Sequence, residues 1–288
     1  MFKNLNLKIV RLRGGIGNQL FQYAFAKKLE YYSNENIVFD ISDFYVNKHH
    51  SGFMLDQLVH DIHTTNTNSF LSSPNSAYSR ILRKLHFNNK FIYYEKSIGY
   101  DDMSYKSSKS YFDGYWQSHS YFHGIEEILK ASIKFSPTLE SKFVNLIREI
   151  SDCTSVSVHV RRGDYLIAKN LNIYESVGVN YYKEVLSLLI KMFGRIRIYI
   201  FTDDTKWVRE NFNFIDQEIV IVSEMTNSAI EDLYLMQLCK INVIANSSFS
   251  WWAAYLNKNV HKIVYMPSKW YKNLSTPVDL IPSNWITV

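Results

Sequence analysis

The sequence predicts an α/β protein of two domains, each built on a parallel β-sheet. In the second half of the chain, segments with the period of a strand alternate with segments of helical period. This alternation is typical of a parallel sheet that helices cover on both faces. A strand, a glycine turn and a helix also open the first half, and 288 residues suffice for two cores. We expect the domains to comprise residues 1–150 and 151–288, with a cleft between them.

The first half begins with the apolar segment Leu7 to Leu12, which predicts a strand. Three glycines follow within four positions, at Gly14, Gly15 and Gly17, and predict a tight turn. Apolar residues then recur at helical spacing, which predicts a helix: Leu20, Phe21, Ala24, Phe25, Ala26 and Leu29. From Tyr45 to about Tyr111 the chain is rich in Asn, Ser and Tyr, and we expect loops and short helices there.

The second half shows five strand patterns, of which the first alternates valines with polar residues. The expected strands are 156–160, 196–200, 219–222, 241–245 and 262–266. Between them we expect a helix over 181–193 that Gly194 ends. A second helix follows a capping box at Ser228 to Glu231, and a third runs from Ser247 or Ser248 through Leu256.

Composition and charge exclude several classes of protein. With 47% hydrophobic and 20% charged residues the chain is a folded globular protein, not a disordered one. No apolar run approaches the ~18 residues of a membrane-spanning helix, and residues 1–12 lack the apolar core of a signal peptide. Two cysteines are too few for a disulfide framework. These features predict a cytoplasmic protein, and the dispersed net charge of +5 does not predict nucleic-acid binding.

In parallel sheets, ligands bind outside the carboxyl ends of the strands. This rule selects four segments as candidate sites: 13–19, 159–165, 202–204 and 246–250.

The segment 159–165 reads His-Val-Arg-Arg-Gly-Asp-Tyr and follows a predicted strand. His159 and Arg161 leave this strand on one face and Arg162 on the other, and Gly163 permits a sharp turn. An arginine at a strand end is suited to bind phosphate oxygens in a bidentate way. Asp164 is either a general base or a partner that holds an arginine. The alternative for the whole segment is an ion-pair network at the surface.

The segment 246–250 follows another strand and opens a helix. Backbone N–H groups and serine hydroxyls at such a position can bind phosphate, and plain N-capping is the alternative. The residues are Asn246, Ser247, Ser248, Phe249 and Ser250. The next two residues, Trp251 and Trp252, are expected to pack in the core.

Two further segments have weaker signals. The turn after the first strand contains Arg13, Gly15, Gly17, Asn18 and Gln19. Its glycines let the backbone approach a ligand closely. It matches neither the dinucleotide-binding motif nor the P-loop. Asp203 and Asp204 are adjacent, and no Asp-x-Asp occurs in the chain. Carboxylates on neighbouring positions diverge, so we expect them to accept hydrogen bonds from a base or ribose rather than to share a metal ion.

Together these four segments resemble the α-1,2-fucosyltransferases of glycosyltransferase family 11. The resemblance lies in residues 13–22, 159–165, 201–204 and 246–254, which occur in the order of the family. It implies a GT-B fold of two Rossmann-like domains. The acceptor-side domain would be 1–150, and 151–288 would bind the GDP-sugar.

The resemblance also implies an activity: inverting transfer of L-fucose from GDP-β-L-fucose to O2 of a terminal β-galactoside. Such enzymes need no cofactor or metal, so a protein cation must neutralise the diphosphate of the donor. The resemblance assigns this role, which we call the diphosphate clamp, to Arg161. His159, Arg162, Asp203 and Asp204 would contact the donor, and Ser247 to Ser250 its phosphates. Gly15 to Gln19 would close the cleft, and Asp164 is our candidate for the base. Bacterial members of this kind decorate surface polysaccharides such as O-antigen on lipid-linked acceptors, which suggests a cytoplasmic enzyme at the inner membrane face.

Two alternatives remain open at this point. Another inverting GDP-sugar transferase with a different acceptor would share the same donor motifs. A non-catalytic nucleotide- or RNA-binding module would fit the net positive charge and the many aromatic residues. RNA binding, however, favours a continuous basic groove, and the basic residues of this chain are dispersed.

Overall fold

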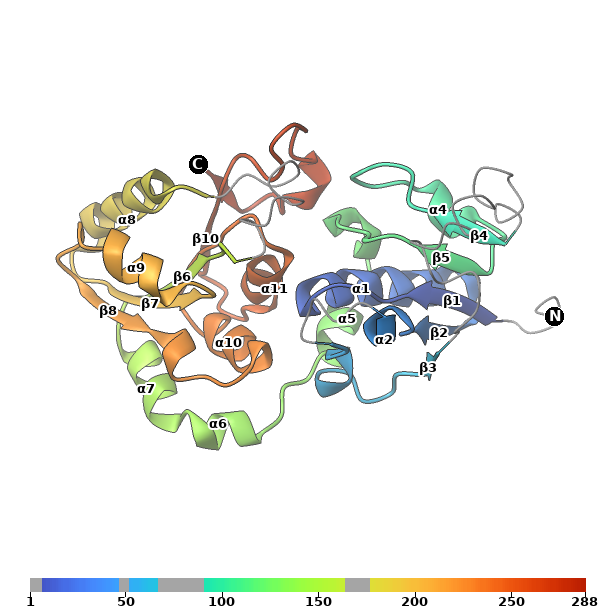
Figure 1. Cartoon of the computed structure of the whole chain (residues 1–288), viewed down its shortest axis with the longest axis horizontal. Coiled ribbons are helices and arrows are strands. Elements are labelled where there is room, and N and C mark those ends of the chain that lie inside the picture. The colour runs from blue at the N-terminus through green and yellow to red at the C-terminus, as the bar shows by residue number, and fades with distance from the viewer. Residues whose placement is uncertain (1–6, 47–51, 67–90, 164–176) are drawn as a thin grey trace. The chain divides into compact units, whose positions relative to one another are not determined.

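The computed structural model describes residues 7–46, 52–66, 91–163 and 177–288. They form two compact units (Figure 1). Unit 1 contains Met1–Lys134 and Pro277–Ile281, and unit 2 contains Phe135–Thr276 and Pro282–Val288. Both units are α/β and contain a wholly parallel sheet, as the sequence predicts.

The division between the units lies before Phe135 rather than near Ile150, because the helices that precede Ile150 pack on unit 2. Phe135 contacts Tyr234 with ring centroids 5.3 Å apart, and Lys142 forms an ion pair of 2.6 Å with Glu231. The chain also returns to unit 1 near its end, where the Ser118 hydroxyl donates to the backbone oxygen of Asp279 at 3.2 Å.

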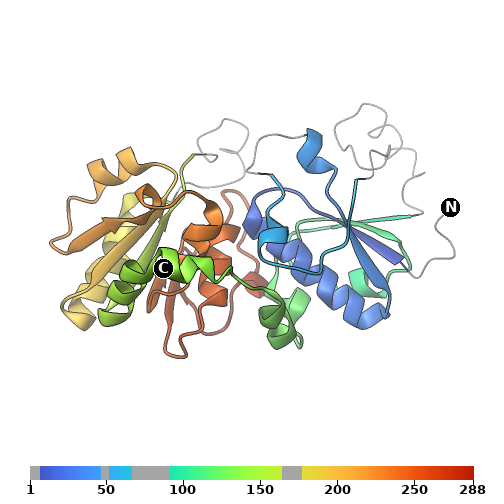
Figure 2. The same ribbon diagram turned by 90° about the horizontal axis from the view of Figure 1, so that it is seen from below.

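In the described residues of unit 1, the sheet has five strands in the order β3-β2-β1-β5-β4. Helix α1 follows the glycine turn and packs on the sheet through Phe25, whose ring lies 5.7 Å from that of Phe112 on β5. Figure 2 shows α1 in blue below the sheet. The described elements are β1 (Leu7–Arg11), α1 (Ile16–Ser33), β2 (Asn36–Asp40), α2 (Asp43–Val46), β3 (Thr64–Thr65), β4 (Ile92–Tyr94), α4 (Met103–Lys106), β5 (Tyr111–Asp113) and α5 (Glu126–Ser132).

The described part of unit 2 contains a sheet of six strands in the order β11-β10-β9-β6-β7-β8. All five strands and all three helices that the sequence predicts in this half are confirmed, within a few residues at their ends. The elements are α6 (Thr138–Lys142), α7 (Val144–Asp152), β6 (Ser155–Val160), α8 (Val179–Phe193), β7 (Arg197–Thr202), α9 (Thr205–Asn211), β8 (Glu218–Ile221), α10 (Ala229–Met236), β9 (Ile241–Val243), α11 (Ser248–Leu256), β10 (Ile263–Met266) and β11 (Ile286–Thr287).

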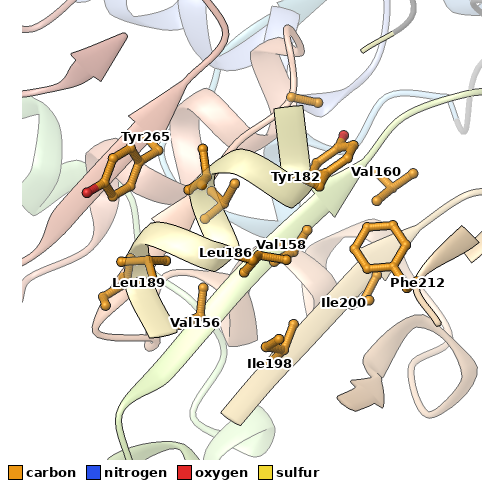
Figure 3. Close-up of a cluster of buried hydrophobic side chains, with 14 of the residues drawn as sticks. Val156, Val158, Val160, Tyr182, Leu186, Leu189, Ile198, Ile200, Phe212 and Tyr265 are labelled. Atoms are coloured by element: carbon orange, nitrogen blue, oxygen red, sulfur yellow. The ribbon is translucent and has the colours of Figure 1, made fainter. Parts of the chain in front are cut away.

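The two faces of β6 differ in character. Val156, Val158 and Val160 point into an apolar cluster with Leu186 of α8 and Val208 of α9 (Figure 3). The opposite face carries polar side chains toward α10 and α11. There, Asn242 of β9 donates to the Ser157 hydroxyl at 2.7 Å and accepts from Asn257 at 2.8 Å. The polar face of β6 therefore leads to the strand end where His159 and Arg161 lie.

Candidate active site

Each sheet has a point at which the strand order reverses, and ligands of parallel sheets bind there. In unit 2 this point lies between β6 and β9, so the segments after these two strands, 161–163 and 244–247, lie at the same edge. In unit 1 it lies between β1 and β5. Three of the four segments that the sequence selects, 159–165, 202–204 and 246–250, are in unit 2, and the fourth is in unit 1.

Arg161 lies beside Asp203 because β6 and β7 pair in parallel with Val160 opposite Thr202. The Arg161 Nη1 atom is 2.9 Å from Asp203 Oδ2. The side chains of Arg161 and Asp203 are 31% and 25% exposed. This ion pair therefore fixes the direction of a guanidinium that solvent still reaches.

Asp203 also fixes the backbone that follows β6. Its Oδ1 accepts from the N–H of Arg162 at 2.9 Å, and its Oδ2 accepts from the N–H of Gly163 at 3.1 Å. A Cβ atom at Gly163 would lie 2.9 Å from Asp203 Oδ2, which is too close for a side chain. Glycine at 163 therefore allows this carboxylate to hold the turn.

Arg162 points away from Arg161 and has partners of its own. Its Nε lies 3.3 Å from Asp204 Oδ2, and its guanidinium lies 4.4 Å from the ring centroid of Trp207. The other oxygen of Asp204 caps α9 by accepting from the N–H of Trp207 at 2.9 Å. The two adjacent carboxylates thus diverge, as the sequence predicts, and each pairs with a different arginine, which it did not predict.

His159 is buried on the polar face of β6. Its Nδ1 is 2.9 Å from the Ser250 hydroxyl oxygen, and its ring lies 5.4 Å from that of Phe249. Burial, together with the nearby Arg161 guanidinium, lowers the pKa of His159 to about 3, so the ring is neutral at neutral pH.

The Ser250 hydroxyl ties the His159 ring to the start of α11. Besides Nδ1 of His159, its oxygen lies 3.3 Å from the backbone oxygen of Ser247 and 3.4 Å from that of Ala245. In a neutral imidazole one ring nitrogen donates and the other accepts, so Nδ1 and Nε2 of His159 have opposite roles.

The segment 246–250 opens α11 as predicted. Ser247 is the N-cap, and its hydroxyl accepts from the N–H of Phe249 at 3.4 Å. Asn246 is buried and donates to the backbone oxygen of Trp270 at 3.0 Å. Ser248 and Phe249 are half-buried, so this helix start reaches solvent.

Trp251 and Trp252 pack in the core of unit 2. Both are fully buried, and the Trp251 ring stacks 5.1 Å from Tyr255 and lies 5.2 Å from Trp285. Neither tryptophan is a surface for stacking a ligand.

Asp164, the candidate base, lies outside the described residues. The described part of the chain contains no group of three or more His, Cys, Asp or Glu side chains that could hold a metal ion.

The glycine turn of unit 1 lies at the switch point of that sheet. Gly14 has a φ of 78°, which favours glycine, and Gly15 is the N-cap of α1 without a side-chain hydrogen bond. A Cβ at Gly15 would meet no atom within 4 Å, so the backbone borders open space. Gly17 is buried, while Asn18 is half-buried and accepts from the Gln117 amide at 2.8 Å.

The side-chain amide of Gln19 forms all its hydrogen bonds with the backbone of this region. Its amide donates to the backbone oxygens of Gly14 and Gly52 at 2.9 and 3.0 Å. Its oxygen accepts from the N–H groups of Met54 and Leu55 at 3.0 and 3.1 Å. These four bonds fill the capacity of an amide, so Gln19 positions the loop rather than presenting its amide to a ligand.

The same edge of unit 1 carries charged residues that the sequence analysis missed. Asp113 lies 3.3 Å from Arg13 and 3.1 Å from the buried Arg11, which also pairs with Asp43 at 2.5 Å. Glu95 accepts from two backbone N–H groups in the turn after β5. Acidic residues that follow predicted strands would have been the signal, but the sequence pattern did not predict β4 and β5.

Comparison with known proteins places this arrangement in a family. The family model described as Glycosyl transferase family 11 matches residues 8–287. An alpha-1,2-colitosyltransferase of Escherichia coli is 30% identical over 300 residues, which cover 99% of this chain and 99% of that protein.

Two other relatives match over a shorter range. The O-antigen biosynthesis glycosyltransferase WbnK of Escherichia coli is 36% identical over 139 residues, covering 48% of this chain and 45% of WbnK. A galactoside 2-alpha-L-fucosyltransferase of Caenorhabditis elegans is 28% identical over 162 residues, covering 52% of this chain and 43% of that enzyme.

The fold of this chain is also similar to the folds of solved structures. A variant of FUT1 from Arabidopsis thaliana in complex with GDP aligns with a TM-score of 0.55 and 11% identity, covering 95% of this chain and 72% of that chain. This similarity confirms the GT-B class of two parallel α/β units. In the described ranges, none of the helices combines the length and apolar character that crossing a bilayer requires. The match of the family model over nearly the whole sequence shows that the chain belongs to glycosyltransferase family 11.

Proposed function

We propose that this glycosyltransferase transfers L-fucose from GDP-β-L-fucose to O2 of a terminal β-galactoside with inversion, in the synthesis of O-antigen or another surface polysaccharide. The observation that carries the proposal is Arg161, held by Asp203 at the switch point of unit 2. Membership of family 11 favours an enzyme over the non-catalytic nucleotide- or RNA-binding module.

In this proposal unit 2 binds the GDP part of the donor. The guanidinium of Arg161 has five N–H donors, so it can serve Asp203 and a β-phosphate oxygen together. The helix start at Ser247 to Ser250 faces the phosphates with backbone N–H groups. Neutral His159 would form a hydrogen bond with the nucleoside through Nε2.

The proposed reaction is one displacement at the anomeric carbon of fucose. A bond forms between acceptor O2 and C1, while the bond from C1 to the β-phosphate oxygen breaks and its electron pair leaves with GDP. Arg161 stabilises the charge that develops on the phosphate. A base takes the proton of the acceptor hydroxyl, and we assign this role to Asp164 from its place in the sequence.

Colitose is a second candidate for the transferred sugar, because the relative that aligns end to end is a colitosyltransferase. Colitose is fucose without its 3-hydroxyl. A site that hydrogen-bonds a substrate hydroxyl rejects the analogue that lacks it by about 10⁴–10⁵, so the two donors are readily separated.

The experiment supplies GDP-L-fucose and GDP-colitose separately to the enzyme, with lactose and Gal-β1,3-GalNAc as acceptors. Linkage in the product is determined by NMR. Our proposal predicts an α-1,2-linked fucosyl product and a much lower rate with GDP-colitose. The opposite donor preference would assign the colitosyl activity, and another linkage would contradict the acceptor assignment.

A further inference from the structure

Two turns meet at the switch point of unit 1. The glycine turn at 13–18 follows β1, and the turn at 113–117 follows β5, its parallel neighbour. Gln117 donates to Asn18 at 2.8 Å, and Arg13 pairs with Asp113 at 3.3 Å. Side chains thus join the two turns into one surface, which we call the paired-turn surface and define by Arg13, Asn18 and Tyr115; Gln117 is buried beneath it.

The backbone of the second turn is held in a strained conformation. Trp116 has a φ of 56°, which is uncommon for a residue other than glycine, and its ring is buried 3.9 Å from the Phe25 ring, stacked in parallel. Glu95 accepts from the N–H groups of Tyr115 and Trp116 at 2.7 and 2.9 Å. Such strain persists only where the surroundings enforce it, and it clusters at functional sites.

The consequence of this geometry is an exposed aromatic ring in a fixed place. Trp116 turns into the core, and its neighbour Tyr115 stays 39% exposed. The guanidinium of Arg13 lies 4.3 Å from the Tyr115 ring centroid and so orients the ring. Asn18, from the same turn as Arg13, is half-buried and accepts from the buried Gln117.

These groups suit a neutral sugar. A pyranose presents an apolar C–H face, which packs on an aromatic ring, and hydroxyls that pair with amide and guanidinium groups. The charges around the surface do not favour phosphate, because three carboxylates, those of Asp43, Glu95 and Asp113, accompany two guanidinium groups, those of Arg11 and Arg13. Burial raises the pKa of Glu95, although its backbone hydrogen bonds oppose this.

We propose that the paired-turn surface binds the terminal sugar of the acceptor, with the Tyr115 ring as its stacking platform and Arg13 and Asn18 as its polar contacts. This inference rests on the proposed transferase function and names the subsite that would select the acceptor. Glu95 is a positioning residue of the turn.

The test compares Tyr115→Ala and Tyr115→Phe with Tyr31→Ala, a control at a tyrosine of α1 that is 66% exposed. Initial rates are measured against lactose at saturating donor, together with GDP affinity and donor hydrolysis without acceptor. We expect Tyr115→Ala to raise the KM for lactose roughly tenfold, as loss of a stacked ring does. Tyr115→Phe keeps the ring and should recover most of the affinity for lactose that Tyr115→Ala loses. Tyr31→Ala should stay within about twofold of wild type, and its GDP affinity and donor hydrolysis should be unchanged.

An unchanged KM in Tyr115→Ala, or an equal rise in Tyr31→Ala, would overturn the subsite. Saturation-transfer NMR with methyl β-galactoside separates this result from failure of the proposed transferase function, because it requires no turnover. If the wild type transfers no sugar but binds the galactoside and Tyr115→Ala does not, the subsite stands and the reaction is wrong. If the wild type neither transfers to nor binds the galactoside, the subsite is refuted.

Discussion

Arg161 and Asp203 form an ion pair of 2.9 Å across the carboxyl ends of the neighbouring strands β6 and β7. The same carboxylate accepts from the backbone at Arg162 and Gly163. One acidic residue thus orients both the candidate phosphate clamp and the turn that follows it.

Arg161→Ala should lower kcat/KM by about 10²–10³, because a charge partner of the leaving phosphate is lost. Arg161→Lys should recover little of this, since an ammonium group cannot reproduce the planar fork of a guanidinium. Steady-state transfer kinetics measure both variants. Near-normal kinetics of Arg161→Ala would place the clamp elsewhere, for instance at Arg162 or Arg13.

Asp203→Asn should slow transfer with little effect on thermal stability. The ion pair is partly exposed, and such pairs contribute at most about 1 kcal/mol to folding. Because Asp203 orients the Arg161 guanidinium as well as the turn, part of its effect should disappear in the Arg161→Ala background, giving a coupling of about 0.5–3 kcal/mol.

Asp152→Asn, at an exposed position at the end of α7, serves as the control for this double-mutant cycle. Losses that simply multiply in the double variant would show that Asp203 and Arg161 act independently.

The buried histidine predicts a dependence of stability on pH. The pKa of His159 is about 3 in the folded protein and about 6.5 in the unfolded chain. Between these values the unfolded chain binds a proton that the folded protein does not. The contribution of His159 to the free energy of unfolding is therefore fully present above pH 6.5. It decreases as the pH falls, by about 1 kcal/mol per pH unit.

Urea unfolding of the wild type and of His159→Gln at pH 7, 6, 5 and 4 measures this effect. The free energy of unfolding of the wild type should decline more steeply than that of the variant. Parallel curves would show that His159 accepts a proton in the folded protein.

The elements that could be predicted from the sequence are those with a clear hydrophobic period. Alternating valines predicted β6 and the end at which His159 and Arg161 lie. The contact of Arg161 with Asp203 could not be predicted, because it depends on the register that sets Val160 opposite Thr202. A shift by one residue would have brought different side chains together.

Unit 1 was less predictable for a physical reason. Strands β4 and β5 are three residues long, too short to show a period, and their pairing creates the turn that holds Tyr115. The positive φ of Trp116 is imposed by packing on Phe25 and by Glu95, residues distant in sequence. The return of 277–281 to unit 1 likewise has no local signal.

We predict that transfer does not depend on a divalent metal ion. In the proposed site, Arg161 and the start of α11 would supply the positive charge and N–H donors that a metal would otherwise provide. The rate should be the same after dialysis against EDTA and after addition of Mn²⁺ or Mg²⁺. Loss of turnover in EDTA with recovery in Mn²⁺ would contradict the assignment of the phosphate clamp to protein groups.

Calorimetry with GDP and GMP measures whether Arg161 binds the β-phosphate of a GDP-sugar. GDP and GMP differ only in that phosphate. Arg161→Ala should weaken GDP binding roughly ten- to a hundredfold, as loss of a hydrogen bond to a charged group does, and should leave the Kd for GMP within about twofold. Equal changes in the two Kd values, or no change in either, would contradict it.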